Sequence, residues 1–89
     1  MSDVLMYCTA FCSYCVRAEQ LLTRKGVAIT KIQVDNDPLL WEEMENKTGR
    51  QTVPQIYIGK YHVGGYDDMA ELDMEGKLDE LLEPILKNS

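Results

Sequence analysis

An unbroken apolar run near the start of the chain, Val4-Leu5-Met6-Tyr7-Cys8, is the feature that most constrains the fold. A strand with one face in water alternates apolar and polar residues, whereas a strand covered on both faces is apolar throughout. We therefore expect residues 4–8 to form a central strand of a sheet with helices on both faces. A chain of 89 residues has room for a single domain, spanning residues 1–89.

The first half of the chain continues with a helix, a strand and a second helix. From Cys12 the apolar residues recur at helical spacing, and Lys25-Gly26 ends that helix. Apolar and polar residues alternate over residues 28–34, which predicts a second strand. Asp37 is a candidate N-cap with a proline directly after it, and the helix that it begins ends near Gly49.

The second half of the chain predicts a hairpin and two helices. Two apolar runs, residues 55–58 and 61–63, flank a Gly-Lys pair, as the strands of a tight hairpin do. After the hairpin, either Asp67 or Asp68 is expected to cap a short helix over residues 69–75. A stripe of leucine and isoleucine at helical spacing predicts the final helix.

The predicted element order is therefore β-α-β-α-β-β-α-α. Because a helix connects the first two strands, we expect these strands to be parallel and their connection to be right-handed. The last two strands are expected to form an antiparallel hairpin. An α/β fold follows, in which a four-stranded mixed sheet is flanked by helices.

The charge and hydropathy of the chain limit the kinds of partner that it can bind and the places where it can work. The formal net charge is −6, and residues 67–89 carry eight carboxylates against two lysines, so nucleic-acid binding is disfavoured. No apolar run approaches the roughly 18–20 residues of a membrane span. The segment from Met1 to Leu5 lacks the basic start and apolar stretch of a signal peptide, which leads us to expect a cytoplasmic protein.

All three cysteines fall within eight residues, which is the first functional signal. Cys12 and Cys15 lie where the first strand gives way to the first helix, so the free N–H groups and positive end of that helix favour a thiolate on Cys12. Cys15 lies one turn further on the same face and can attack a mixed disulfide formed on Cys12. The two residues form a dithiol switch, and Arg17 adds positive charge nearby.

The competing interpretation of a Cys-X-X-Cys pair is half of a metal site. A structural zinc site needs a second pair of ligands, and only Cys8 and His62 are available as further sulfur or nitrogen ligands. One lies in a predicted strand and the other in a predicted hairpin, which is not the spacing of a zinc knuckle. We therefore favour redox chemistry and expect no protein-ligated metal.

Several nearby residues have a plain structural interpretation. Cys8 is expected to be a small buried residue at a strand end, although an auxiliary role, including a disulfide with Cys12, stays open. Trp41 and Tyr57 are expected to pack in the interior, and His62 to be a polar residue of the hairpin.

Three ordered motifs together make the chain resemble the dithiol glutaredoxins of the thioredoxin superfamily. They are Cys12-Ser13-Tyr14-Cys15, Thr52-Val53-Pro54-Gln55-Ile56-Tyr57-Ile58 and Gly64-Gly65-Tyr66-Asp67-Asp68. The resemblance covers essentially the whole chain, and it implies a thioredoxin-like fold and one glutaredoxin domain over residues 1–89.

The resemblance also implies a glutathione site. The Val53-Pro54 bond is expected to be cis, which would turn the Val53 backbone outward to pair with the cysteinyl part of glutathione. Asp68 would hold the γ-glutamyl ammonium. Many relatives carry a lysine where this chain has Thr9, so Arg50, with Gln51 as second choice, is expected to bind the glycyl carboxylate in its place. The implied binding residues are Tyr14, Arg50, Gln51, Thr52, Val53, Pro54, Gly65, Tyr66, Asp67 and Asp68.

The leading functional hypothesis is a monomeric, glutathione-dependent thiol–disulfide oxidoreductase that acts on protein disulfides and on glutathionylated proteins. Ser13, where proline is commoner in the family, motivates the alternative of a dimer that holds a [2Fe–2S] cluster through Cys12 and glutathione from each subunit. A thioredoxin-like donor reduced by a flavoprotein is a third hypothesis, and the segment from Gly64 to Asp68 argues against it.

Overall fold

The structure is a computed structural model that describes residues 3–87, so Met1, Ser2 and the last two residues lie outside it. Its elements are β1 (Val4–Cys8), α1 (Ser13–Arg24), β2 (Ile29–Gln33), α2 (Pro38–Thr48), β3 (Gln55–Ile58), β4 (Tyr61–Gly64), α3 (Tyr66–Met74) and α4 (Lys77–Lys87). The predicted order of strands and helices is confirmed.

The four strands form one mixed sheet in the order β2-β1-β3-β4. β1 pairs in parallel with β2 and antiparallel with β3, and β3 and β4 form the predicted antiparallel hairpin. β1 therefore lies in the interior of the sheet, as its unbroken apolar sequence predicted, and the arrangement is thioredoxin-like.

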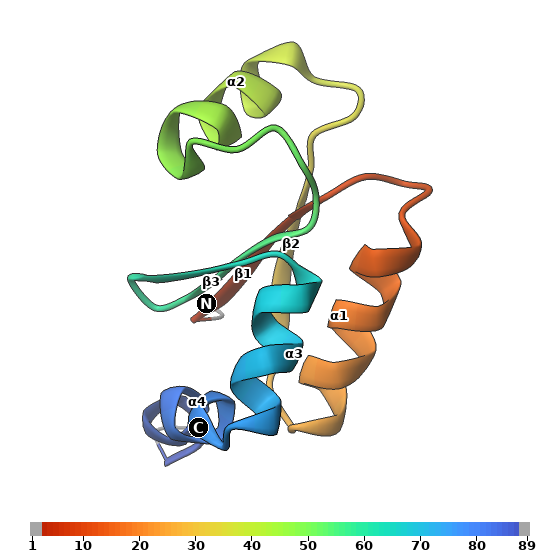
Figure 1. The fold of residues 1–89 in the computed structure, drawn as a ribbon. Helices are drawn as coiled ribbons and strands as arrows, with labels where there is room; N and C mark the ends of the chain where they lie inside the picture. The colour runs from red at the N-terminus through yellow and green to blue at the C-terminus, as the bar shows by residue number, and fades with distance from the viewer. Residues whose placement is uncertain (1–2, 88–89) are drawn as a thin grey trace.

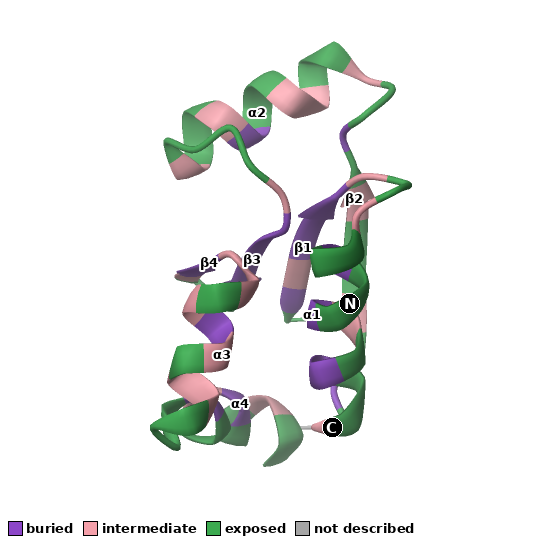
Figure 2. Cartoon of the chain, turned by 45° about the vertical axis from the view of Figure 1, so that its right-hand side comes forward, coloured by how far each residue is buried: buried purple, intermediate pink, exposed green. Residues whose placement is uncertain are grey.

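Helices cover both faces of the sheet. In Figure 1, α2 lies above the sheet, whereas α1, α3 and α4 lie below it. Because successive side chains of a strand point to opposite faces, Met6 and Cys8 join the larger apolar cluster with α1, while Tyr7 joins a smaller cluster with Met44 of α2. Figure 2 shows the buried residues gathered on β1 and on the inner sides of α1 and α3. Trp41 packs against the smaller cluster, and Tyr57 is one of its buried members, as expected.

The local signals place most helix ends correctly. Asp37 is the N-cap of α2, and its side chain accepts hydrogen bonds from the N–H groups of Leu39 and Leu40. Gly49 ends α2 in the left-handed conformation, with φ of 71°. Among residues 3–87, the structure contains no helix with the length and apolar character needed to cross a bilayer.

The start of α3 corrects a prediction. Neither Asp67 nor Asp68 is the cap, because α3 begins at Tyr66 with Gly65 as its N-cap. Gly64 has φ of +107° and turns the chain sharply at the end of β4, so the helix begins about a turn earlier than expected. Asp68 lies in the first turn, and its carboxylate reaches back to accept from the Gly65 N–H over 2.9 Å.

Candidate active site

Cys12 is the N-cap residue of α1. Its backbone is extended (φ −131°, ψ 106°), and its Sγ accepts a hydrogen bond from the Cys15 backbone N–H over 3.1 Å. The first turn of α1 contains no acidic residue, so no carboxylate there neutralises the positive end of the helix dipole. The sulfur therefore lies at the N-terminus of α1, within reach of a backbone N–H donor, at the junction of strand and helix where the sequence placed Cys12.

Cys15 has the opposite environment. It is buried, with 5% of its surface exposed, and this burial, followed by its hydrogen bond with Cys12, raises the pKa of Cys15 to about 12. The Cys15 thiol therefore stays protonated at neutral pH. Cys12 is partly exposed, so the two thiols differ in their access to solvent.

Cys8 lies behind the dithiol as a buried residue at the end of β1. Burial raises the pKa of the Cys8 thiol, which disfavours its thiolate form. Its membership of the larger apolar cluster confirms the packing role that the sequence predicted. It lines a small cavity of about 120 Å³ together with Cys12 and Cys15.

These environments predict which thiol is alkylated. Iodoacetamide at pH 7 is expected to add one carbamidomethyl group to the folded protein, at Cys12, because Cys8 and Cys15 are buried. Peptide mass mapping locates the adduct. The same reaction in guanidinium chloride serves as the control and should modify all three cysteines. An adduct on Cys15 before Cys12 in the folded protein would contradict these assignments.

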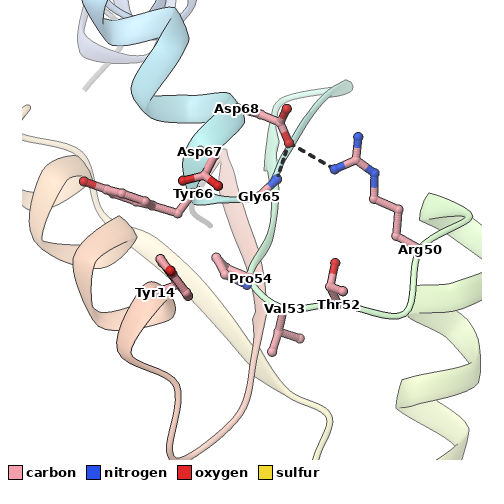
Figure 3. A pocket seen from close by; sticks show the side chains of 9 residues that line it. All are labelled: Tyr14, Arg50, Thr52, Val53, Pro54, Gly65, Tyr66, Asp67 and Asp68. Carbon is pink, nitrogen blue, oxygen red and sulfur yellow. Dashed lines mark hydrogen bonds and ion pairs between the residues drawn. The ribbon is translucent and has the colours of Figure 1, made fainter.

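A groove of about 270 Å³ opens beside the dithiol. It lies between the start of α1, the segment between α2 and β3, and the start of α3 (Figure 3). Its lining residues are Tyr14, Arg50, Thr52, Val53, Pro54, Gly65, Tyr66, Asp67 and Asp68. Cys12 Sγ lies 3.9 Å from the Val53 carbonyl oxygen, and the Val53–Pro54 peptide bond is cis. The fold thus brings the predicted residues, apart from Gln51, to one place next to Cys12.

An ion pair lies at one end of the groove. Arg50 Nη1 and Asp68 Oδ2 are 3.0 Å apart, and Figure 3 shows these side chains pointing toward one another. The Gly65 backbone N–H, and then the Arg50 guanidinium, hold the pKa of the Asp68 carboxyl below its usual value. Both side chains remain about half exposed, so each is accessible to a charged ligand.

The lowered pKa of Asp68 predicts a pH dependence of stability. A carboxyl whose pKa is lower in the folded than in the unfolded state stabilises the fold above its unfolded pKa, and this contribution disappears as pH falls through the folded value. The difference in free energy of unfolding between the wild type and Asp68→Asn should therefore be constant above about pH 5 and shrink below about pH 4. Urea titrations at several pH values measure it, with Asp67→Asn as the control for loss of a neighbouring charge. A difference that grows on acidification would contradict the assignment.

Two predicted neighbours of the site have other contacts. The Gln51 side chain donates to Glu45 Oε2 over 3.4 Å and does not line the groove. The Arg17 guanidinium lies 5.6 Å from the centre of the Tyr14 ring, whose own centre is 6.2 Å from that of Tyr66. Arg17 is therefore stacked at the groove edge, where it supports Tyr14.

Comparison with known proteins decides the family. A family model described as glutaredoxin matches residues 4–63. The chain belongs to the glutaredoxin family. As a member of it, the protein is an enzyme, a thiol–disulfide oxidoreductase whose Cys-X-X-Cys pair is Cys12 and Cys15.

The similarity to individual glutaredoxins spans nearly the whole chain. A glutaredoxin of Pseudomonas aeruginosa is 54% identical over 82 residues, which are 92% of this chain and 98% of that protein. Glutaredoxin 3 of Escherichia coli is 45% identical and covers 92% of this chain and 99% of its own length. The crystal structure of a buckwheat glutaredoxin–glutathione complex superposes with a TM-score of 0.86 at 28% identity, over 93% of this chain and 78% of that one.

Two features of this glutaredoxin were missed by the sequence analysis. The pairing of Arg50 with Asp68 joins residues 18 positions apart, and no local pattern indicates it. Gln55 is the buried polar residue of the described core, with no exposed surface. The sequence feature that could have indicated this burial is the position of a polar residue at the start of an otherwise apolar strand.

Proposed function

We propose that this glutaredoxin uses glutathione to reduce protein disulfides and glutathione mixed disulfides. The observation that carries the proposal is the position of the helix-capping sulfur of Cys12 beside a groove that ends in a cation and an anion, Arg50 and Asp68. A tripeptide with a thiol, an ammonium and two carboxylates matches that set of groups. The buckwheat relative whose structure is a complex with glutathione supports the same ligand.

The proposed reaction is thiol–disulfide exchange in two displacements. The Cys12 thiolate attacks the glutathionyl sulfur of a mixed disulfide, and the bond to the protein substrate breaks as its sulfur leaves and takes up a proton. A glutathione thiolate then attacks the glutathionyl sulfur on Cys12, releases oxidised glutathione and restores the Cys12 thiolate. With a protein disulfide as substrate, Cys15 instead attacks the mixed disulfide on Cys12, and two glutathione molecules reduce the resulting Cys12–Cys15 disulfide.

The groove residues have separate tasks in this proposal. The Val53 backbone pairs with the cysteinyl part of glutathione and so directs its sulfur toward Cys12. Asp68 takes the γ-glutamyl ammonium, near the first backbone N–H groups of α3, which suit the adjoining carboxylate. Arg50 exchanges its contact with Asp68 for the glycyl carboxylate. Tyr14 and Tyr66 border the bound tripeptide.

The test compares two mixed disulfides of one peptide, one with glutathione and one with cysteamine, which lacks every peptide and carboxylate group of glutathione. Turnover is followed through glutathione reductase and NADPH. We expect kcat/KM to be at least about tenfold higher for the glutathionylated peptide, because charge-assisted contacts exist only for it. Equal values would overturn the proposal, as would reduction only by thioredoxin reductase.

We infer a monomer without a cluster as the working form in the cytoplasm, where thiols are kept reduced. Within residues 3–87, no three histidine, cysteine, aspartate or glutamate side chains are grouped to hold a metal ion, and Cys12 is the one cysteine that is not buried. A [2Fe–2S] cluster would therefore need Cys12 and a glutathione thiolate from each of two subunits. Anaerobic reconstitution with iron, sulfide and glutathione, followed by gel filtration, is expected to return a colourless monomer, and a brown dimer would revive the cluster hypothesis.

A further inference from the structure

Gln55 connects the interior of the sheet to the backbone of the groove. Its side chain is completely buried, and its Nε2 donates to the Thr52 carbonyl oxygen over 2.9 Å and lies 3.2 Å from Thr52 Oγ1. Thr52 directly precedes Val53, whose backbone faces the proposed cysteinyl part of glutathione. A side chain that touches no ligand thus holds the segment that is proposed to bind one.

His62 determines which way the Gln55 carboxamide points. His62 Nε2 lies 2.8 Å from Gln55 Oε1. Because the Thr52 carbonyl only accepts, the Gln55 NH₂ group must face Thr52, and its oxygen must then face His62 and accept from an Nε2–H. The reverse orientation would place two acceptors together at Thr52. The imidazole is stacked on its cross-strand partner Tyr57, with ring centres 4.8 Å apart, so its own orientation is fixed by packing.

The electrostatic surroundings favour the neutral imidazole that this arrangement uses. Burial, and then the positive charge of Arg50, lower the pKa of His62, while Asp68 acts in the opposite direction. At neutral pH the ring therefore has one proton, and the contact with Gln55 assigns it to Nε2. Nδ1 is left as the acceptor nitrogen of the ring.

The orientation of one peptide group follows from this chain of hydrogen bonds. The Val53–Pro54 bond is the one cis peptide of the described chain, so the Thr52–Val53 peptide is trans. In a planar trans peptide the C=O and N–H groups point in opposite directions. With the Thr52 carbonyl held toward Gln55, the Val53 N–H points away from the sheet interior, toward the side on which Val53 lines the groove.

We propose that His62 and Gln55 are positioning residues that act in sequence to present the Val53 N–H to the cysteinyl carbonyl of bound glutathione. This inference rests on the proposed function and names the residues that shape its site. Neither residue lines the groove, and their side-chain hydrogen bonds go to Thr52 and to one another. Their effect is on how well the glutathionyl group is bound, and the reactivity of Cys12 is independent of them.

The test uses two substitutions at one position. His62→Phe keeps a ring over Tyr57 but removes the donor, whereas His62→Gln restores an N–H donor at nearly the same distance from the backbone. With the glutathionylated peptide, His62→Phe is expected to raise KM roughly fivefold to tenfold with kcat changed by less than about twofold, and His62→Gln to recover most of the loss. The rate of Cys12 alkylation by iodoacetamide should be the same in all forms, and Tyr61→Phe, at the adjacent exposed position, is the matched control.

Each result has a defined meaning. A rise in KM that comes with a fall of similar size in the Cys12 alkylation rate would show a general structural role and overturn the inference. Failure of His62→Gln to lower KM again would overturn it as well. ¹⁵N NMR of the wild type tests it independently of how the variants fold, because an Nδ1–H tautomer of His62 would also overturn it. If the wild type itself fails to prefer the glutathionylated over the cysteamine-linked peptide, the proposed function fails, whereas a wild type that prefers it and a His62→Phe variant with unchanged KM contradict this inference alone.

Discussion

A Cys12→Ser variant is expected to lose at least about a thousandfold in kcat/KM for the glutathionylated peptide. Serine keeps the shape of the N-cap and its hydrogen bond to the Cys15 N–H, so α1 stays capped. A hydroxyl does not ionise near neutral pH and is no nucleophile for a disulfide sulfur. The glutathione reductase assay measures the loss, and circular dichroism verifies that the variant is folded.

Cys15→Ser is the matched variant for that experiment. It replaces a buried thiol one turn away and leaves Cys12 as the attacking group, so reduction of the glutathionylated peptide should persist within about fivefold of wild type. Reduction of a protein disulfide should instead fall strongly, because its mixed disulfide with Cys12 then has no intramolecular resolving thiol. If Cys15→Ser abolished deglutathionylation and Cys12→Ser spared it, the two roles would have to be exchanged.

Gly64→Ala is expected to have the second largest effect, on both stability and substrate binding. A Cβ at this position would lie 2.4 Å from Asp68 Oδ2 and 3.0 Å from Arg50 Nη1, and the backbone φ of +107° is itself strained for alanine. The substitution therefore displaces the Asp68 carboxylate from both the Gly65 N–H and the Arg50 guanidinium. We expect the free energy of unfolding to fall by about 2–4 kcal/mol.

The same variant should raise KM for the glutathionylated peptide roughly tenfold or more, because Asp68 no longer occupies its position at the end of the groove. Gly59→Ala is the matched control, since Gly59 also has a positive φ, of +60°, but nothing lies within 4 Å of the added Cβ. It should cost about 1 kcal/mol of stability and leave KM unchanged. Urea denaturation and steady-state kinetics separate the two effects, and equal KM values in both variants would show that the contact with Asp68 is unimportant.

Patterns within single segments predicted most of the fold. The unbroken apolar run of β1 placed that strand in the interior of a sheet covered on both faces, and Asp37 placed the start of α2 at the residue observed. The start of α3 was wrong by about a turn. A φ of +107° at Gly64 depends on how the end of β4 meets the sheet, and the two aspartates that follow offered an equally good local cap signal.

Local sequence patterns predicted less of the candidate site than of the fold. The position of Cys12 at the start of α1 was predictable, because strand, cysteine and helix are contiguous. The resemblance to glutaredoxins supplied the groove residues, and nine of the ten line it. Neither source indicated that Arg50 pairs with Asp68, or that Gln55 joins His62 to Thr52, because these contacts link segments that are separate in sequence.

The amino-acid sequence alone determined the order of strands and helices and placed a cysteine sulfur at a helix N-terminus. Hydrophobic periodicity, capping residues and the Cys-X-X-Cys spacing are local properties of the sequence, and they do not depend on the rest of the fold. Only the tertiary structure decided what surrounds that sulfur: the burial that keeps Cys15 protonated, the ion pair at the end of the groove and the buried amide behind Thr52. Burial and hydrogen-bond partners are decided when segments that are distant in sequence pack together. The hydrophobic periodicity of one segment does not indicate which side chains of other segments it will contact.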